Sequence, residues 1–173
     1  MFQQNLEHDC CELDLQRLQN DFVRQSCDGV IAAGGGKVLD SGKLLADRLE
    51  VPCVTVPLSA ATCAGWTALS NLYSPDGAFD RDQGLRHCPD LLVFDHELLI
   101  KAPTRTLASG IADALAKWYE ASVSSGSSQD GVIQQAVQMA RVLRDQLLID
   151  SIEAIQEPGC EAWKRVVDAC GLT

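Results

Sequence analysis

The sequence is poor in positive charge and has no long apolar run. Its 173 residues include 14 lysines and arginines against 24 aspartates and glutamates, which gives a formal net charge of −10. Such acidity argues against nucleic acid or an anionic membrane as the main partner. No segment is apolar enough to span a bilayer, and the N-terminal MFQQNLEHDCC has no signal-peptide core. We therefore expect a cytoplasmic chain that binds neither nucleic acid nor membrane.

The eight cysteines include no C-x-x-C pair. Their scattered spacing excludes a zinc knuckle and does not suit a small disulfide scaffold. We expect most of them to be buried free thiols that pack as small apolar residues. Cys63 is the exception to examine, because it lies in a loop rich in serine and threonine.

The chain also lacks both standard phosphate-binding signatures. Gly34, Gly35 and Gly36 follow an apolar run, but position 31 is Ile, Gly36-Lys37 is followed by Val, and position 39 is Leu, so neither pattern is complete. A glycine turn before a helix still offers backbone N–H groups and the positive end of the helix dipole to a phosphate. The alternative is a tight turn that only lets the helix pack on a sheet. We favour phosphate binding.

The first hundred residues alternate between predicted helices and predicted strands. Apolar residues at helical spacing indicate a helix over 12–26, and the continuous apolar run at 30–33 indicates a buried strand covered on both faces. Alternation of this kind is typical of a parallel sheet with right-handed crossovers. We also expect strands at 52–56 and 90–95, a helix over 36–49, and a long functional loop over 58–89 with a hairpin-turn signal at Pro75-Asp76-Gly77.

The composition changes near Pro103, after which only helices are expected. They cover 106–123, 132–156 and 160–170, and SSGSSQDG at 124–131 connects the first two. The 132–156 stretch is marked by apolar positions including Val132, Met139, Val142 and Leu147. The sequence therefore predicts an incomplete α/β parallel sheet over 1–102, followed by the start of an all-helical domain over 103–173.

Asp40 and Lys43 lie three residues apart and so share a helix face. In one interpretation they form a solvated ion pair worth a few tenths of a kcal/mol, roughly as exposed pairs do. In the other, Asp40 lies near a ligand hydroxyl or amide while Lys37 lies near a phosphate.

Three stretches together carry a family resemblance. They are GGGKVLDSGKLLADRL, VPCVTVPLSAATCAGWTALSNLYSPDGAF and PDLLVFDHELLIKAPTRTLASGIADALAKWYEA. They resemble the glycerol dehydrogenase branch of the iron-containing alcohol dehydrogenase family. The resemblance implies a Rossmann-like dinucleotide-binding domain over 1–102 and a helical metal and substrate domain over 103–173. It also implies hydride transfer between NAD(H) or NADP(H) and an alcohol, polyol or carbonyl substrate, with Zn²⁺ or Fe²⁺ holding the substrate oxygen.

The resemblance also assigns roles to individual residues. Asp113 in GIADAL matches the carboxylate metal ligand, and Cys63 takes a position at which glycerol dehydrogenases commonly have an acidic residue facing a substrate hydroxyl. The residues expected along the cofactor are Gly35, Gly36, Lys37, Asp40, Leu58, Ser59 and Thr62, with Thr67, Leu69 and Tyr73 at its nicotinamide end.

The chain departs from the family pattern in its histidines. The family metal site needs two histidines after the aspartate, whereas His8, His87 and His96 all precede Asp113. A single carboxylate does not hold a catalytic zinc, which usually takes three protein ligands. Family members are also about twice as long, so we expect an internal fragment that is inactive alone and a homo-oligomer when complete.

Three interpretations of function follow. The leading one is a truncated, metal-dependent alcohol or polyol dehydrogenase. Cys63, a poor hydrogen-bond acceptor, also points to a 2-oxo or hydroxy acid as an alternative substrate, and a nucleophilic role for it is disfavoured because no histidine lies close in sequence. The second is a non-catalytic remnant that binds nucleotide or another subunit. The third, a kinase-like phosphate binder, lacks the lysine–serine pair it would need.

Overall fold

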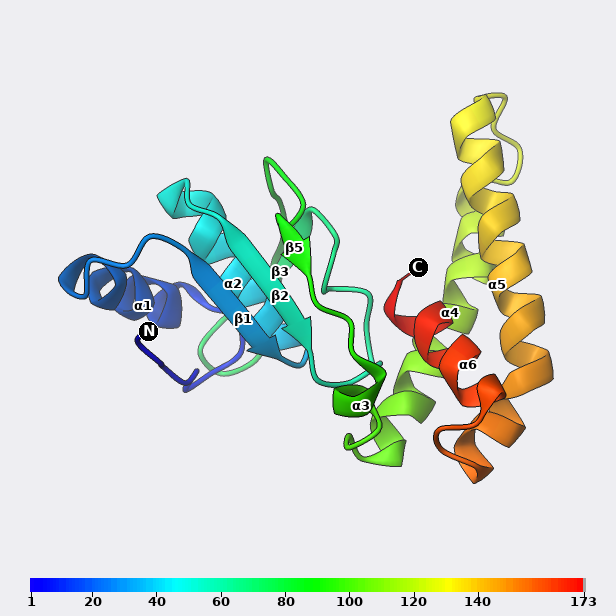
Figure 1. Ribbon diagram of the computed structural model, residues 1–173. Helices are drawn as coiled ribbons and strands as arrows, with labels where there is room; N and C mark the ends of the chain where they lie inside the picture. The colour runs from blue at the N-terminus through cyan, green and yellow to red at the C-terminus, as the bar shows by residue number, and fades with distance from the viewer. Residues whose placement is uncertain (173) are drawn as a thin grey trace. The chain divides into compact units, whose positions relative to one another are not determined.

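The computed structural model describes residues 1–172, which form two compact units (Figure 1). The first contains Met1–Leu58 and Ala64–Asp95, and the second contains Ser59–Cys63 and the chain from His96 onward. The short segment Ser59–Cys63 therefore packs with the helices although it is flanked by the sheet unit in sequence. The assignment of 1–102 and 103–173 as cofactor and metal domains stays a prediction.

The first unit is built on a parallel sheet. Its strands are β1 (Val30–Gly34), β2 (Cys53–Pro57) and the short β5 (Leu91–Leu92), in the order β1-β2-β5. Helix α2 (Gly36–Leu49) connects β1 to β2 and begins and ends where the sequence predicts. The parallel α/β arrangement expected from the alternating pattern is confirmed.

Only one face of this sheet is covered in the part of the chain that the structure describes. Ala32 and Thr55 point toward α2 and are buried, whereas Ile31 on the opposite face is 62% exposed. The prediction that the 30–33 strand is covered on both faces was therefore wrong. A continuous apolar run does not reveal which of its two faces is packed.

Helix α2 packs closely on the sheet because Gly42 has no side chain. A Cβ atom at Gly42 would lie 2.3 Å from the Ala32 Cβ. Close approach lets α2 bury its apolar residues, which pack with α1 (Glu12–Arg24) and the segment before it. This core contains Cys10, Leu15, Leu44, Leu45 and Leu72.

The expected long loop contains an antiparallel hairpin. Strands β3 (Leu69–Tyr73) and β4 (Phe79–Gly84) pair across a turn in which Gly77 has a φ of +85°. A left-handed conformation of this kind favours glycine. The turn signal in SPDGAF was therefore right, but 58–89 is not one long loop, because β3 and β4 lie within it.

The second unit is helical after the Ser59–Cys63 segment. A short α3 (His96–Leu99) precedes α4 (Thr104–Ser125), α5 (Gly131–Gln156) and α6 (Glu161–Gly171), and the three long helices pack on one another. Asp130 caps α5 by accepting hydrogen bonds from the amides of Val132 and Ile133. Arg165 of α6 pairs with buried Asp150 of α5 at 2.7 Å. The all-helical second half is confirmed. No described helix has the length and apolar character needed to cross a membrane.

The apolar positions that mark the 132–156 stretch are mostly on the exposed side of α5. Val132, Met139 and Val142 are each more than 60% exposed, and only Leu147 of those four is buried. The buried face of α5 is formed instead by Val137, Leu143, Leu147, Asp150 and Ala154.

The cysteines are all free thiols, and four of the eight are buried. Burial raises the pKa of Cys10 and Cys53 to about 11 and that of Cys170 to about 12. At pH 8 a thiol of pKa about 11 is about one part in a thousand thiolate, the reactive form. We expect iodoacetamide to modify exposed Cys88 in the native protein and to leave these three unmodified, as measured by peptide mass mapping.

A denatured sample is the control for this labelling, because unfolding exposes every thiol. All eight cysteines should then react. Native-state labelling of Cys170 at the rate of Cys88 would contradict the packing of α6.

Candidate functional site

The glycine turn lies at the carboxyl end of β1 and leads directly into α2. Gly35 is the N-cap of α2, with φ −83° and ψ −175°, and no side chain caps the helix. The amides of Val38 and Leu39 donate to the Gly35 carbonyl oxygen at 3.0 and 3.1 Å. The two amides before them, of Gly36 and Lys37, are therefore the ones that an anion at this helix end would engage.

Gly34 is required for the shape of the turn. A Cβ atom at Gly34 would lie 2.7 Å from the Val38 Cβ. The Gly34 carbonyl oxygen accepts a hydrogen bond from the Leu58 amide at 3.0 Å. That bond holds the ends of β1 and β2 together. The glycine run in the sequence includes Gly34, but the residues that the resemblance assigns to the cofactor begin at Gly35.

Lys37 lies in the first turn of α2 with its side chain 57% exposed. Its Nζ is 3.4 Å from Asp9 Oδ1. An exposed pair of this length contributes little to stability, roughly 0–1 kcal/mol. Another anion can therefore easily replace Asp9 as the partner of Lys37. The geometry suits the predicted contact between Lys37 and a phosphate, which stays a prediction.

Asp40 and Lys43 form a buried ion pair rather than a solvated one. Lys43 Nζ lies 3.2 Å from Asp40 Oδ1, and its side chain is 1% exposed. Burial raises the pKa of Asp40, and the attraction of the Lys43 charge offsets only part of that effect. The amide of Asn71 donates to Asp40 Oδ2 at 3.3 Å, so this carboxylate links α2 to β3. Of the two interpretations of this pair, the solvated one is wrong, and cofactor binding by Asp40 stays a prediction.

Lys43 also fixes the residues expected at the nicotinamide end. Its Nζ donates to the Thr67 carbonyl oxygen at 3.1 Å, to Thr67 Oγ1 at 3.2 Å and to the Leu69 carbonyl oxygen. The Tyr73 amide donates to the Cys10 carbonyl oxygen at 2.8 Å, and the Tyr73 ring packs edge-on against Phe79. Sequence reasoning missed Lys43 as the group that positions β3, because its partners lie far along the chain.

In the helical unit, the Ser59–Cys63 segment packs directly against α4. A Cβ atom at Gly110, the glycine of GIADAL, would lie 1.9 Å from the Ala60 carbonyl oxygen. Only glycine lets the helix approach the segment backbone so closely. Ser59, Thr62 and Cys63, which were expected to contact the cofactor or substrate, therefore belong to a segment that packs against α4.

Cys63 lies beside Lys117, and Lys117 lies beside Asp113. Lys117 Nζ donates to Cys63 Sγ at 3.4 Å and is 3.7 Å from Asp113 Oδ2. The Asp113 side chain is 57% exposed, so its carboxylate is accessible. Sequence reasoning missed Lys117, although it lies one helical turn after Asp113 and so shares its face.

The predicted residues thus divide between the two units. The helical unit holds four of them, and the sheet unit holds the others. The sheet unit contains Gly35, Gly36, Lys37, Asp40, Leu58, Thr67, Leu69 and Tyr73, and the helical unit contains Ser59, Thr62, Cys63 and Asp113.

The residues around Asp113 do not form a metal site by themselves. Among residues 1–172, three or more metal-ligating side chains come together only at His8, Cys11 and Asp14, in the sheet unit. Asp113 offers one carboxylate, and no histidine follows it in this chain. A zinc site usually needs three protein ligands, so this donor set does not fit the expected metal.

Comparison with known proteins places these features in a family. The family model described as iron-containing alcohol dehydrogenase matches residues 2–96. An uncharacterised oxidoreductase of Synechocystis is 53% identical over 161 residues, covering 93% of this chain and 42% of that protein. Hydroxycarboxylate dehydrogenase A of Escherichia coli is 37% identical over 153 residues, covering 86% of this chain and 41% of that protein.

A solved structure gives the same relationship. The crystal structure of a probable glycerol dehydrogenase from Sinorhizobium meliloti superposes with a TM-score of 0.88 at 27% identity, over 98% of this chain and 50% of that one. The chain therefore spans about half the length, or less, of the relatives it matches. Because the matched segment covers more than half of its residues, the chain belongs to the iron-containing alcohol dehydrogenase family and is related to glycerol dehydrogenases.

Proposed function

We propose that the sheet unit binds the diphosphate of NAD(H) or NADP(H) at the turn formed by Gly34–Lys37. The observation that carries this proposal is the helix N-terminus at the carboxyl end of β1, which has no side-chain cap and an exposed lysine in its first turn. In open α/β sheets, ligands bind at the carboxyl ends of the strands, and helix N-termini favour phosphates. The complete protein would transfer a hydride between this cofactor and an alcohol, polyol or carbonyl substrate.

The bound cofactor would supply the hydride chemistry, and the chain's own residues would supply position and charge. The amides of Gly36 and Lys37 would donate to phosphate oxygens, and the Lys37 ammonium would neutralise part of their charge. Lys43 would hold Thr67 and Leu69 in place through its three hydrogen bonds without touching the cofactor. Asp113 would contribute one ligand to a metal, but the present residues do not complete that site and no step is assigned to it.

A second substrate class, the 2-hydroxy or 2-oxo acids, is favoured by Lys117. Its ammonium lies 3.4 Å from Cys63 Sγ. Cys63 takes the position at which glycerol dehydrogenases commonly have an acidic residue. A thiol accepts hydrogen bonds weakly, so it is a poor partner for a polyol hydroxyl, whereas an ammonium binds a carboxylate well. The relationship to a hydroxycarboxylate dehydrogenase supports the same substrate class.

Replacing Lys37 by glutamate tests the proposed cofactor site. We expect the Kd for NADH to rise about tenfold, which corresponds to about 1.4 kcal/mol, because the change replaces attraction at the phosphates by repulsion. Enhancement of nicotinamide fluorescence measures the binding.

Lys101→Glu is the matched control, since it makes the same charge change at an exposed lysine of the helical unit. It should leave the Kd within twofold. Equal Kd values for wild type and Lys37→Glu would contradict the site. Binding of NADH without turnover of any alcohol would favour the interpretation of this chain as a nucleotide-binding remnant.

A further inference from the structure

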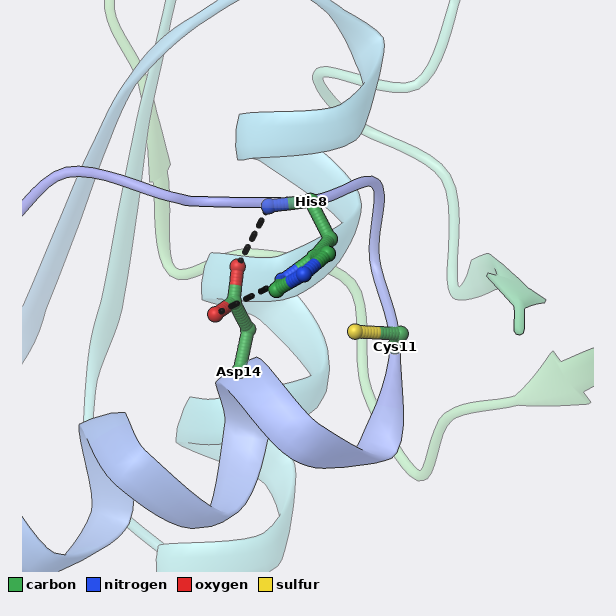
Figure 2. A group of neighbouring side chains, drawn as sticks. All are labelled: His8, Cys11 and Asp14. Carbon is green, nitrogen blue, oxygen red and sulfur yellow. Dashed lines mark hydrogen bonds and ion pairs between the residues drawn. The ribbon is translucent and has the colours of Figure 1, made fainter. Parts of the chain in front are cut away.

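The segment before α1 gathers three metal-ligating side chains that the proposed function does not use. A ring nitrogen of His8, Cys11 Sγ and an Asp14 carboxylate oxygen all lie within 4.8 Å of one another, and Figure 2 shows the three side chains. They are spaced three residues apart, so the chain turns from an extended segment into the first turn of α1 around them. The three donors are a nitrogen, a sulfur and an oxygen.

Cys11 offers a buried thiol at a helix N-terminus. The residue is 0% exposed and is the N-cap of α1, yet its side chain does not cap the helix. A thiolate is the form of cysteine that binds metal ions.

Asp14 is a charged and firmly oriented carboxylate. The amides of Glu7 and His8 donate to its Oδ2 at 2.8 and 3.0 Å, and the residue is 1% exposed. Burial alone would raise the pKa of Asp14, but these hydrogen bonds and that of Arg17 outweigh it and lower the pKa. Oδ1 faces the His8 ring, so one oxygen is fixed by the backbone and the other is directed toward the cluster.

His8 places its ring nitrogen at a suitable distance from this oxygen. Nδ1 is buried, makes no hydrogen bond, and lies 3.5 Å from Asp14 Oδ1. Two ligands of a tetrahedral zinc, each about 2.1 Å from the metal, are about 3.4 Å apart. The His8–Asp14 separation therefore matches that of two ligands of one ion.

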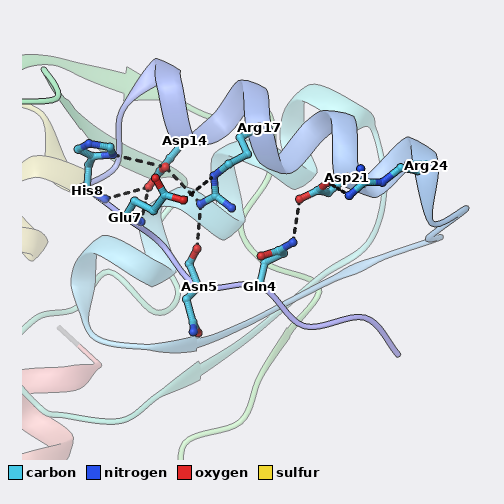
Figure 3. Close-up of polar contacts among 8 residues, drawn as sticks. All are labelled: Gln4, Asn5, Glu7, His8, Asp14, Arg17, Asp21 and Arg24. Atoms are coloured by element: carbon cyan, nitrogen blue, oxygen red, sulfur yellow. Dashed lines mark hydrogen bonds and ion pairs between the residues drawn. The ribbon is translucent and has the colours of Figure 1, made fainter.

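Arg17 is a nearby cation that would compete with a metal. Its guanidinium lies 3.2 Å from Asp14 Oδ1. The same side chain also donates to the Asn5 carbonyl oxygen at 2.8 Å and lies 3.7 Å from Glu7 (Figure 3). Arg17 can therefore give up Oδ1 and keep two other partners.

We infer that His8, Cys11 and Asp14 bind a zinc-type divalent cation. Imidazole and thiolate ligands select zinc over calcium and magnesium, and three protein ligands leave a fourth position for water. The ion would clamp the N-terminal segment onto α1. The same segment reaches the proposed cofactor turn, since Asp9 pairs with Lys37, and reaches β3, since the Cys10 carbonyl oxygen accepts from Tyr73.

Zinc binding by the whole chain tests the inference. Chelator-treated protein is dialysed against zinc and its metal content is measured by elemental analysis. We expect one zinc per chain in the wild type, and at least tenfold weaker binding in His8→Gln and Cys11→Ser. Cys10→Ser is the matched control, because it removes the adjacent buried thiol, and it should bind zinc as the wild type does. Less than one zinc per wild-type chain at saturation, or equal loss in Cys10→Ser, would overturn the inference.

Cobalt substitution reports the thiolate directly. The cobalt-loaded wild type should show a sulfur-to-cobalt charge-transfer band that is absent in Cys11→Ser and present in Cys10→Ser. Since His8 is partly exposed, His8→Gln should fold normally by circular dichroism even if Cys11→Ser does not. Full zinc binding by folded His8→Gln, or a band that persists in Cys11→Ser, would overturn the inference.

Asp113→Asn separates this inference from the proposed function. We expect it to retain the zinc, since Asp113 belongs to the other unit. Loss of the zinc in Asp113→Asn with retention in His8→Gln would place the ion at the proposed substrate site and overturn the inference. Failure of NADH binding would count against the cofactor site only.

Discussion

Replacing Lys43 by methionine is expected to destabilise the sheet unit by about 3–5 kcal/mol, the usual cost of breaking one partner of a buried ion pair. Methionine fills a similar volume but cannot donate to Thr67 or Leu69, and it leaves the Asp40 carboxylate buried without its cation. The loss of unfolding free energy caused by Lys43→Met should become smaller as the pH falls. Burial already raises the pKa of Asp40, and without Lys43 the folded state would bind a proton more readily than the unfolded state does. Urea unfolding at pH 8 and pH 5 measures both effects.

Two further variants sharpen this test. Lys37→Met makes the same substitution at an exposed site of the same helix and should cost about 0.5 kcal/mol or less. The double variant Lys43→Met/Asp40→Leu should recover part of the loss, because it removes the uncompensated charge. A Lys43→Met protein as stable as Lys37→Met would show that the buried pair does not hold α2 to β3.

Replacing Gly110 by alanine is expected to cost the helical unit about 2–3 kcal/mol, in the range found for overpacked sites. The added Cβ would lie 1.9 Å from the Ala60 carbonyl oxygen and 3.1 Å from the Ala61 Cα, and backbone atoms cannot rotate away. The Ser59–Cys63 segment must therefore move. Cys63 would move away from the Lys117 ammonium. The alkylation rate of Cys63 should therefore change along with the free energy of unfolding.

Gly131→Ala is the matched control for Gly110→Ala. Gly131 is the first residue of α5, and a Cβ there would meet no atom within 4 Å. The free energy of unfolding of Gly131→Ala should differ from that of the wild type by about 0.5 kcal/mol or less. Both variants are followed by urea unfolding, with Trp118 and Trp163 as fluorescent reporters of this unit. Equal stability of the two variants would contradict the close packing of α4 on the segment.

The elements that could be predicted from the sequence are those bounded by local signals. Helix α2 begins at the third glycine of the run and ends shortly before Pro52, so its bounds needed no knowledge of tertiary structure. The hairpin turn was likewise marked by Pro75-Asp76-Gly77. Its strands were missed because β4 reads FDRDQG, which has no large apolar residue after Phe79 and lacks the alternation of a half-buried strand.

The parts of the candidate site that could not be predicted depend on partners far along the chain. The spacing of Asp40 and Lys43 suggested either a solvated pair or a ligand contact by Asp40. It did not reveal that three oxygen atoms of Thr67 and Leu69 surround the Lys43 ammonium. Lys117 meets Cys63 only because Gly110 lets that segment approach α4. The glycine run supplied the turn and the family resemblance supplied Asp113, but neither identified Lys43 or Lys117 as a positioning group.

The membership of Ser59–Cys63 in the helical unit has a consequence for proteolysis. The backbone passes from one unit to the other three times, after Leu58, after Cys63 and after Asp95. If a protease cuts the Asp95–His96 bond, the Ser59–Cys63 segment stays covalently part of the N-terminal fragment through its two remaining connections. The same segment still packs against Gly110 of the C-terminal fragment. The two halves of such a nicked chain should co-elute under native conditions and separate only in denaturant.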